Sequence, residues 1–75
     1  MDANSTLDAK GLNCPLPILK AKKALKALET GEVLEIIATD PGSIPDFEAF
    51  CRTTGHELLE ANEEGDLYTF YIKKN

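Results

Sequence analysis

Residues 7–17 read LDAKGLNCPLP and join an expected strand to an expected helix. The strand is predicted at Thr6–Ala9, and the glycine and asparagine of Lys10–Asn13 are typical of a turn. The helix is predicted from Pro15 to Leu28, because apolar side chains recur there at helical spacing and Gly31 follows as an exit residue. The chain therefore opens with a strand, a turn and a helix.

Three more strands and a second helix are expected after this opening. The strands are predicted at Glu32–Thr39, Glu57–Ala61 and Leu67–Ile72, and the first of them is rich in branched side chains typical of a largely buried strand. The second helix is expected to begin at Ser43, where Asp46 three residues later completes a capping-box pattern. A polar turn separates the last two strands.

The element order is β-α-β-α-β-β, which predicts an α/β (α+β) fold in two layers. Crossovers through helices are right-handed, so both helices should cover one face of a four-stranded mixed sheet. The first three strands should run parallel and the last antiparallel. We expect residues 1–75 to form a single domain, with residues 1–4 as a flexible tail.

The composition narrows the functional classes. Thirteen acidic and eight basic side chains give a net charge of −5, which disfavours direct nucleic-acid binding. The start of the sequence has neither a signal peptide nor an apolar span, and two cysteines are too few for a disulfide scaffold. We therefore expect a monomer in the reducing cytoplasm, with no membrane contact.

Cys14 is the candidate reactive residue. At the N-cap of the first helix, its thiolate would be stabilised by the helix dipole, which lowers a cysteine pKa, and the thiolate is the form that attacks sulfur. Pro15 and Pro17 suit positions N1 and N3, which leaves the amides of Leu16 and Ile18 to meet a sulfur anion. Cys14 should stand on an exposed rim of the molecule. The alternative is a structural cap with an idle thiol.

Several segments resemble the TusA/SirA-like sulfur-carrier family across nearly the whole chain. They are residues 7–17 with the CPLP motif, DPGS at 40–43 and FCRTTGHEL at 50–58. The resemblance implies a β-α-β-α-β-β sandwich and a persulfide on Cys14. It also implies a sulfur donor (a cysteine desulfurase or rhodanese-type protein) and an acceptor protein. Family members serve tRNA thiolation, sulfur oxidation and wider sulfur trafficking, so the pathway stays open, as does selenium as an alternative cargo.

Four lysines are predicted on the outer surface of the first helix: Lys20, Lys22, Lys23 and Lys26. They fit a solvated helix face, or a docking surface for an acidic patch on a donor or acceptor. Cys51 is predicted to be a buried structural thiol, and His56 a surface residue at the far end of the sheet from Cys14. One histidine and two cysteines do not supply four ligands for a structural zinc ion.

The sequence thus favours a sulfur carrier, without a cofactor, rather than a turnover enzyme with its own substrate pocket. A regulatory or RNA-binding module with a structural Cys14 is the alternative, against which the negative charge counts. A thiol redox protein is a second alternative, but the sequence lacks a Cys-x-x-Cys pair.

Overall fold

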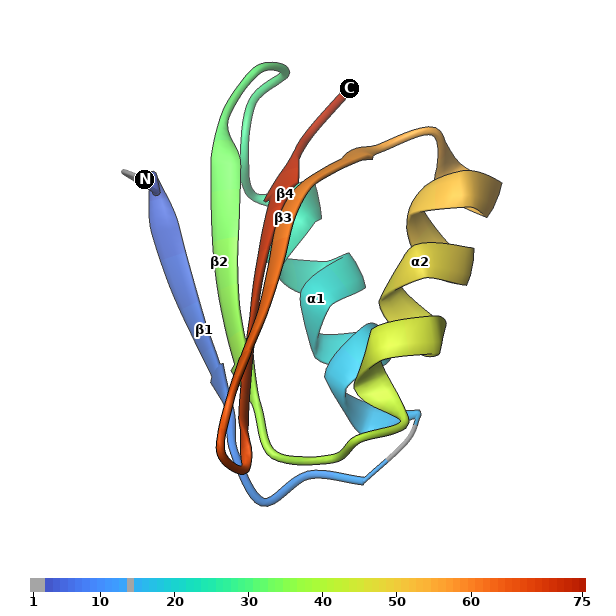
Figure 1. Ribbon diagram of the computed structural model, residues 1–75. Helices are drawn as coiled ribbons and strands as arrows, with labels where there is room; N and C mark the ends of the chain where they lie inside the picture. The colour runs from blue at the N-terminus through green and yellow to red at the C-terminus, as the bar shows by residue number, and fades with distance from the viewer. Residues whose placement is uncertain (1–2, 14) are drawn as a thin grey trace.

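Two helices pack on one face of a four-stranded sheet in the computed structural model, which describes residues 3–13 and 15–75 (Figure 1). The elements are β1 (Ser5–Ala9), α1 (Leu16–Lys26), β2 (Val33–Ala38), α2 (Ser43–Thr54), β3 (Glu57–Glu64) and β4 (Leu67–Lys73). This order confirms the predicted β-α-β-α-β-β arrangement in two layers.

The sheet has the strand order β1-β2-β4-β3. Strand β2 pairs in parallel with β1, and β4 pairs antiparallel with both β2 and β3. Strands β1, β2 and β3 therefore share one direction and β4 opposes them, as predicted. Because β1 and β2 are parallel neighbours, the segments that lead from them into α1 and α2 leave the sheet at the same end (Figure 1).

The core lies between the helices and the covered face of the sheet. Leu34 and Ile36 of β2 are fully buried there, and the rings of Phe47 and Phe70 pack with their centroids 4.8 Å apart. On the opposite face of β2, Glu35 and Ile37 are only half-buried, because no helix covers it. The expectation of a largely buried second strand therefore holds for one face only.

Two element boundaries differ from the sequence predictions by more than one residue. Strand β3 continues to Glu64 instead of ending at Ala61, whereas β4 begins at Leu67 as predicted, so the connecting turn is only Gly65 and Asp66. Gly65 has φ +61°, which suits the first central position of a tight hairpin turn. The sequence did not predict this extension, because the residues at the end of β3 are polar and exposed and show no hydrophobic alternation. Helix α1 ends at Lys26, and the next two residues continue as a tighter turn in which Ala27 N donates to Ala24 O at 3.1 Å.

The predicted cap of the second helix was wrong. Gly42 is the N-cap, and Ser43 is the first helical residue, only 1% exposed. The Ser43 N–H donates to Asp40 O at 2.9 Å, which draws Ser43 into the helix and its side chain into the interior. Its Oγ has no hydrogen-bond partner among the described residues, so the capping box with Asp46 is not formed.

Candidate functional site

Cys14 lies outside the described residues, whereas its neighbours in the sequence, Asn13 and Pro15, are described. The turn before Cys14 lies against the segment after β2, because Gly11 N donates to Thr39 Oγ1 at 2.9 Å. Pro15, which follows Cys14, and Asp46, in the first turn of α2, line the same hollow. The beginnings of both helices therefore meet at one end of the molecule, where Pro15 follows Cys14 in the sequence.

The start of α1 is shifted by one residue from the prediction. Pro15 is the N-cap, and its carbonyl accepts the first helical hydrogen bond from Leu19 N at 3.1 Å. Pro17 accordingly occupies N2 rather than N3, and it is buried. The Leu16 N–H donates to Asn13 O at 2.8 Å, so this amide is already engaged in a turn and is not the unpaired donor for a sulfur anion that the sequence predicted.

The four lysines of α1 are all exposed: Lys20, Lys22, Lys23 and Lys26. Lys22 and Lys26 also line hollows between the helices, whereas Lys20 and Lys23 line neither. Within the described residues the only ion pair joins Lys73 to Glu57, at 3.9 Å, so the α1 ammonium groups are unpaired there. The helix thus presents positive charge that has no ion-pair partner among the described residues.

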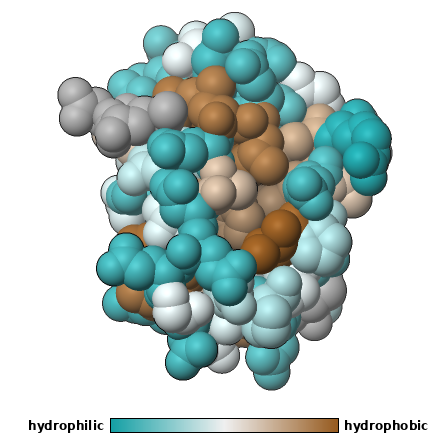
Figure 2. Space-filling view, in the orientation of Figure 1, coloured by the Kyte–Doolittle hydropathy of each residue, from teal (hydrophilic) through white to brown (hydrophobic). Residues whose placement is uncertain are grey.

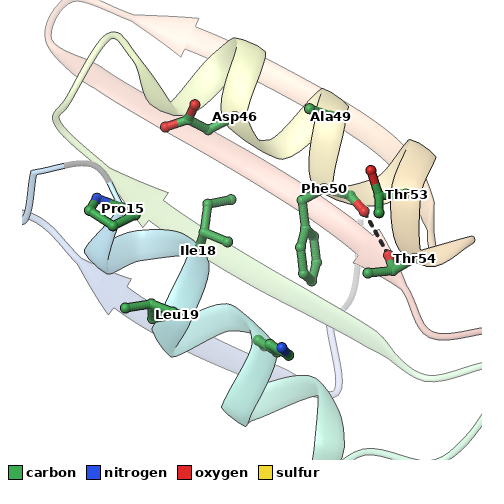
Figure 3. Close-up of a pocket in the computed structure, with 9 residues that line it drawn as sticks. Pro15, Ile18, Leu19, Asp46, Ala49, Phe50, Thr53 and Thr54 are labelled. Atoms are coloured by element: carbon green, nitrogen blue, oxygen red, sulfur yellow. Dashed lines mark hydrogen bonds between the residues drawn. The ribbon is translucent and has the colours of Figure 1, made fainter.

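A hollow of about 450 Å³ runs between α1 and α2 (Figure 3). Its lining is mostly apolar and comes from both helices: Pro15, Ile18, Leu19, Lys22, Asp46, Ala49, Phe50, Thr53 and Thr54. Leu16 and Leu19 are 46% and 55% exposed, although they are large apolar side chains. Figure 2 shows hydrophobic residues as a band across this view of the molecule, between hydrophilic ones.

A second, smaller hollow of about 160 Å³ adjoins the first and shares Lys22, Phe50 and Thr54 with it. Its remaining lining residues are Leu25, Lys26, His56 and Lys74. Together the two hollows make one groove with an apolar end beside Pro15 and a cationic end beside Lys26. Sequence reasoning missed this groove, because it depends on how the two helices pack. The available signal in the sequence was the pair Leu16 and Leu19, apolar residues that are exposed on α1.

Cys51 differs from a reactive cysteine in its burial, and His56 lies at the far end of the groove from Pro15. Cys51 is 6% exposed, and burial raises the pKa of its thiol to about 11, as befits the predicted structural thiol. His56 precedes β3, at the opposite end of the sheet from the start of α1, and its Nδ1 accepts a hydrogen bond from Asn75 N at 3.2 Å. It is half-buried rather than a fully exposed surface residue, because its ring lies 6.1 Å from that of Phe50.

Residues 3–13 and 15–75 bring together no group of three or more potential metal ligands. None of the helices in those ranges has the length and apolar character needed to cross a membrane.

Comparisons with known proteins agree with the sequence resemblance. The family model described as Sulfurtransferase TusA matches residues 5–74. The sulfur carrier protein TusA of Allochromatium vinosum is 60% identical over 74 residues, which cover 99% of this chain and 97% of that protein. A putative sulfur carrier protein of Neisseria meningitidis serogroup A is 54% identical over 70 residues, covering 93% and 95% of the two chains.

The fold has a counterpart among solved structures. The crystal structure of a SirA-like protein from Desulfitobacterium hafniense matches with a TM-score of 0.80 at 27% identity. The match covers 92% of this chain and 95% of that one. Both the predicted architecture and the predicted resemblance are therefore confirmed.

Proposed function

The chain belongs to the TusA family of sulfur carriers, and from this we propose that Cys14 holds a sulfane sulfur as a persulfide and passes it to a protein acceptor. The Cys14 thiolate attacks the terminal sulfur of a donor persulfide. The new S–S bond forms as the old one breaks, and the donor cysteine leaves as a thiolate. An acceptor thiolate then repeats the exchange on the Cys14 persulfide, so no external oxidant or reductant is needed.

The observation that carries this proposal is the family match over residues 5–74, with the CPLP motif intact at Cys14–Pro17. The surroundings support it. Pro15 and Pro17 fix the start of α1 beside Cys14, where the positive end of the helix dipole favours an anion. The groove and the exposed lysines offer a contact surface for a protein, which suits a carrier that hands its cargo over directly.

The exchange partners are a sulfur-donor protein, of the cysteine desulfurase or rhodanese type, and a downstream acceptor. We propose that they dock on the exposed lysine face of α1, formed by Lys20, Lys22, Lys23 and Lys26. The acceptor pathway is tRNA thiolation or another branch of sulfur trafficking, in a reducing cytoplasm that keeps thiols free. We expect the chain to act as a carrier that has no cofactor of its own.

Intact-mass measurement after incubation with a cysteine desulfurase and cysteine tests the assignment of the sulfur site. The mass should rise by one sulfur atom in the wild type and in Cys51→Ser, because only Cys14 is expected to react. It should not rise in Cys14→Ser. Sulfur uptake on Cys51 alone would overturn the proposal, and salt-dependent RNA binding that survives Cys14→Ser, without sulfur loading, would favour the RNA-binding alternative.

A further inference from the structure

The smaller hollow, next to the end of α1, has a cationic lining. Its volume is about 160 Å³, and three lysines from two parts of the chain contribute to its wall: Lys22 and Lys26 on α1, and Lys74 after β4. His56 also lines it, and no described residue in its lining is acidic. The chain as a whole carries a charge of −5, so this local positive charge is opposite in sign to the rest of the molecule. A concave cationic surface attracts anions.

Lys74 is held in place by the fold. Its backbone N–H donates to Glu32 O at 2.9 Å, and its Nζ donates to Leu28 O at 2.6 Å. An ammonium group has three protons, so two of them remain for a ligand. The bond to Leu28 also covers a carbonyl just beyond the end of α1, where the helix dipole disfavours an anion. Lys74 therefore supplies a fixed cation and reduces an unfavourable partial charge.

The proton position on His56 is set by a neighbouring backbone group. Asn75 N donates to His56 Nδ1 at 3.2 Å, so the neutral ring carries its proton on Nε2. The ring is half-buried and its centroid lies 6.1 Å from that of Phe50, which restricts its orientation. His56 thus adds one N–H donor to the three ammonium groups around the hollow.

Lys22 and Lys26 have no partner that would compete with a ligand. Both are exposed, and neither makes a hydrogen bond or an ion pair with a described residue. They are four residues apart, so their side chains lie on the same face of α1. Two ammonium groups at this spacing repel each other, and an anion bound between them offsets the repulsion.

We propose that this hollow binds one small tetrahedral oxyanion with two negative charges, of which sulfate is the simplest probe, between the three ammonium groups and His56 Nε2. The inference goes beyond the proposed function, because the site requires neither Cys14 nor a protein donor. The hollow is several times larger than the roughly 30 Å³ that one water molecule occupies in the liquid, so such an ion fits. Leu25 and Phe50 form an apolar part of the wall, which strengthens the attraction.

Other anions match these cations less well. Each phosphate of a nucleic acid has a single negative charge, and the net charge of −5 repels a polyanion from the chain as a whole. A carboxylate also has a single charge, and its two oxygen atoms accept from fewer donors than the four of a tetrahedral oxyanion. A free dianion therefore fits best, and binding of nucleic acid is a distinguishable outcome of the test.

An NMR titration of the full chain with sodium sulfate, at constant pH 8, tests the inference. His56 is the only histidine in the sequence, so its ring Cε1–H gives a single reporter signal. Sodium chloride at equal ionic strength is the control titration. The site variant is Lys22→Gln, Lys26→Gln. Its matched control is Lys20→Gln, Lys23→Gln, which removes the same charge from exposed positions of α1 that line neither hollow.

The His56 signal should shift and saturate with sulfate at a Kd on the order of 1–10 mM, as expected for several weak charge pairs at an open site. Chloride should shift it little. The Kd should rise roughly tenfold in the site variant, since each lost charge contact weakens binding about threefold, and it should stay within about twofold in the control variant. Circular dichroism checks that both variants are folded. Cys14→Ser should bind sulfate like the wild type, which separates this site from the sulfur chemistry.

Three results would overturn the inference. The sulfate titration could match the chloride titration, which would leave these lysines as a solvated surface. The control variant could weaken binding as much as the site variant, which would indicate a general attraction to the charge of α1. A short single-stranded RNA could shift the His56 signal under conditions in which sulfate does not, which would assign the hollow to nucleic acid.

Discussion

The two cysteines have contrasting positions in the chain. Cys51 is inside α2, packed with core residues and 6% exposed, whereas Cys14 directly precedes the exposed N-cap residue Pro15. Burial disfavours the thiolate of Cys51 and raises its pKa to about 11. The helix dipole near Cys14 acts in the opposite direction, because it favours a negative charge at the helix start.

Alkylation rates as a function of pH should therefore separate the two thiols. Cys14, followed in Cys51→Ser, should react with a pKa below the free-cysteine value of about 8.5, although one amide at the helix start is already engaged. Cys51, followed in Cys14→Ser, should stay unreactive until the pH approaches 11. Mass spectrometry after timed alkylation measures both.

The raised pKa of Cys51 also makes folding depend on alkaline pH. The folded chain binds the Cys51 proton more tightly than the unfolded chain does, so this contribution to stability is complete below about pH 8.5 and is lost as the pH rises through about 11.

A pKa of Cys14 at or above the free value would remove the electrostatic argument for that residue. Fast native-state alkylation of Cys51 near neutral pH would contradict its burial.

For the helices and strands, the spacing of hydrophobic residues predicted which elements exist, but not the residue at which each element begins. The stripe of Ala21 and Leu25 placed α1, and alternating side chains placed β4, because burial selects those positions directly. The cap at Ser43 was predicted wrongly, since a serine before a helix can either cap it or enter it. Hydrogen bonds that the carbonyls of Asp40 and Gly42 accept from Ser43 N and Asp46 N decide this, and these bonds have no sequence pattern of their own.

The groove was beyond sequence reasoning for a related reason. A hydrophobic stripe shows which side of a helix is buried, but not how far apart two helices lie on the sheet. Leu19 belongs to neither the buried side of α1 nor the lysine face. Its part in the groove can be recognised only from the structure, in which Phe50 of α2 lines the same hollow. The sequence therefore predicted the candidate site as Cys14 and the four lysines of the first helix, but not the groove between the two helices.

The start of α2 offers a test of element stability. Ser43 buries a hydroxyl without a partner among the described residues, which costs free energy on folding. Ser43→Ala should raise the free energy of unfolding by about 1 kcal/mol, as it removes this cost and improves helix propensity. Urea denaturation measures the change.

The matched control is Thr53→Ala, which alters an exposed position in the same helix. It should gain only the propensity difference, about half as much or less. If Ser43→Ala were less stable than the wild type, the hydroxyl would have to be hydrogen-bonded, and the account of the helix start given above would be wrong.

Over the whole molecule, positive and negative charges are segregated. Four of the eight basic residues lie on α1, while β3 and its turn carry Glu57, Glu60, Glu63, Glu64 and Asp66, all exposed. An approaching acidic surface is therefore attracted by the helix face and repelled by the hairpin. This asymmetry should orient the carrier during encounter, before the close contacts in the groove form.

The lysines outside the groove test this long-range effect. Lys20→Glu with Lys23→Glu should slow sulfur uptake from a protein donor roughly fivefold at low salt, because exposed charges mainly govern the encounter rate. The fold and the alkylation of Cys14 should be unchanged, since both lysines are exposed and line neither hollow. Stopped transfer reactions analysed by mass, over a range of ionic strength, measure the rate.

The salt dependence separates this long-range effect from short-range contacts. Near 1 M salt the Debye length is about 3 Å, so the Lys20 and Lys23 variant should approach the wild-type rate. The variant Arg52→Glu, Lys73→Glu controls for net charge and should be less affected at low salt, as neither residue is on α1. If transfer were equally fast in the Lys20 and Lys23 variant at low salt, these two residues would be a solvated helix surface with no part in encounter.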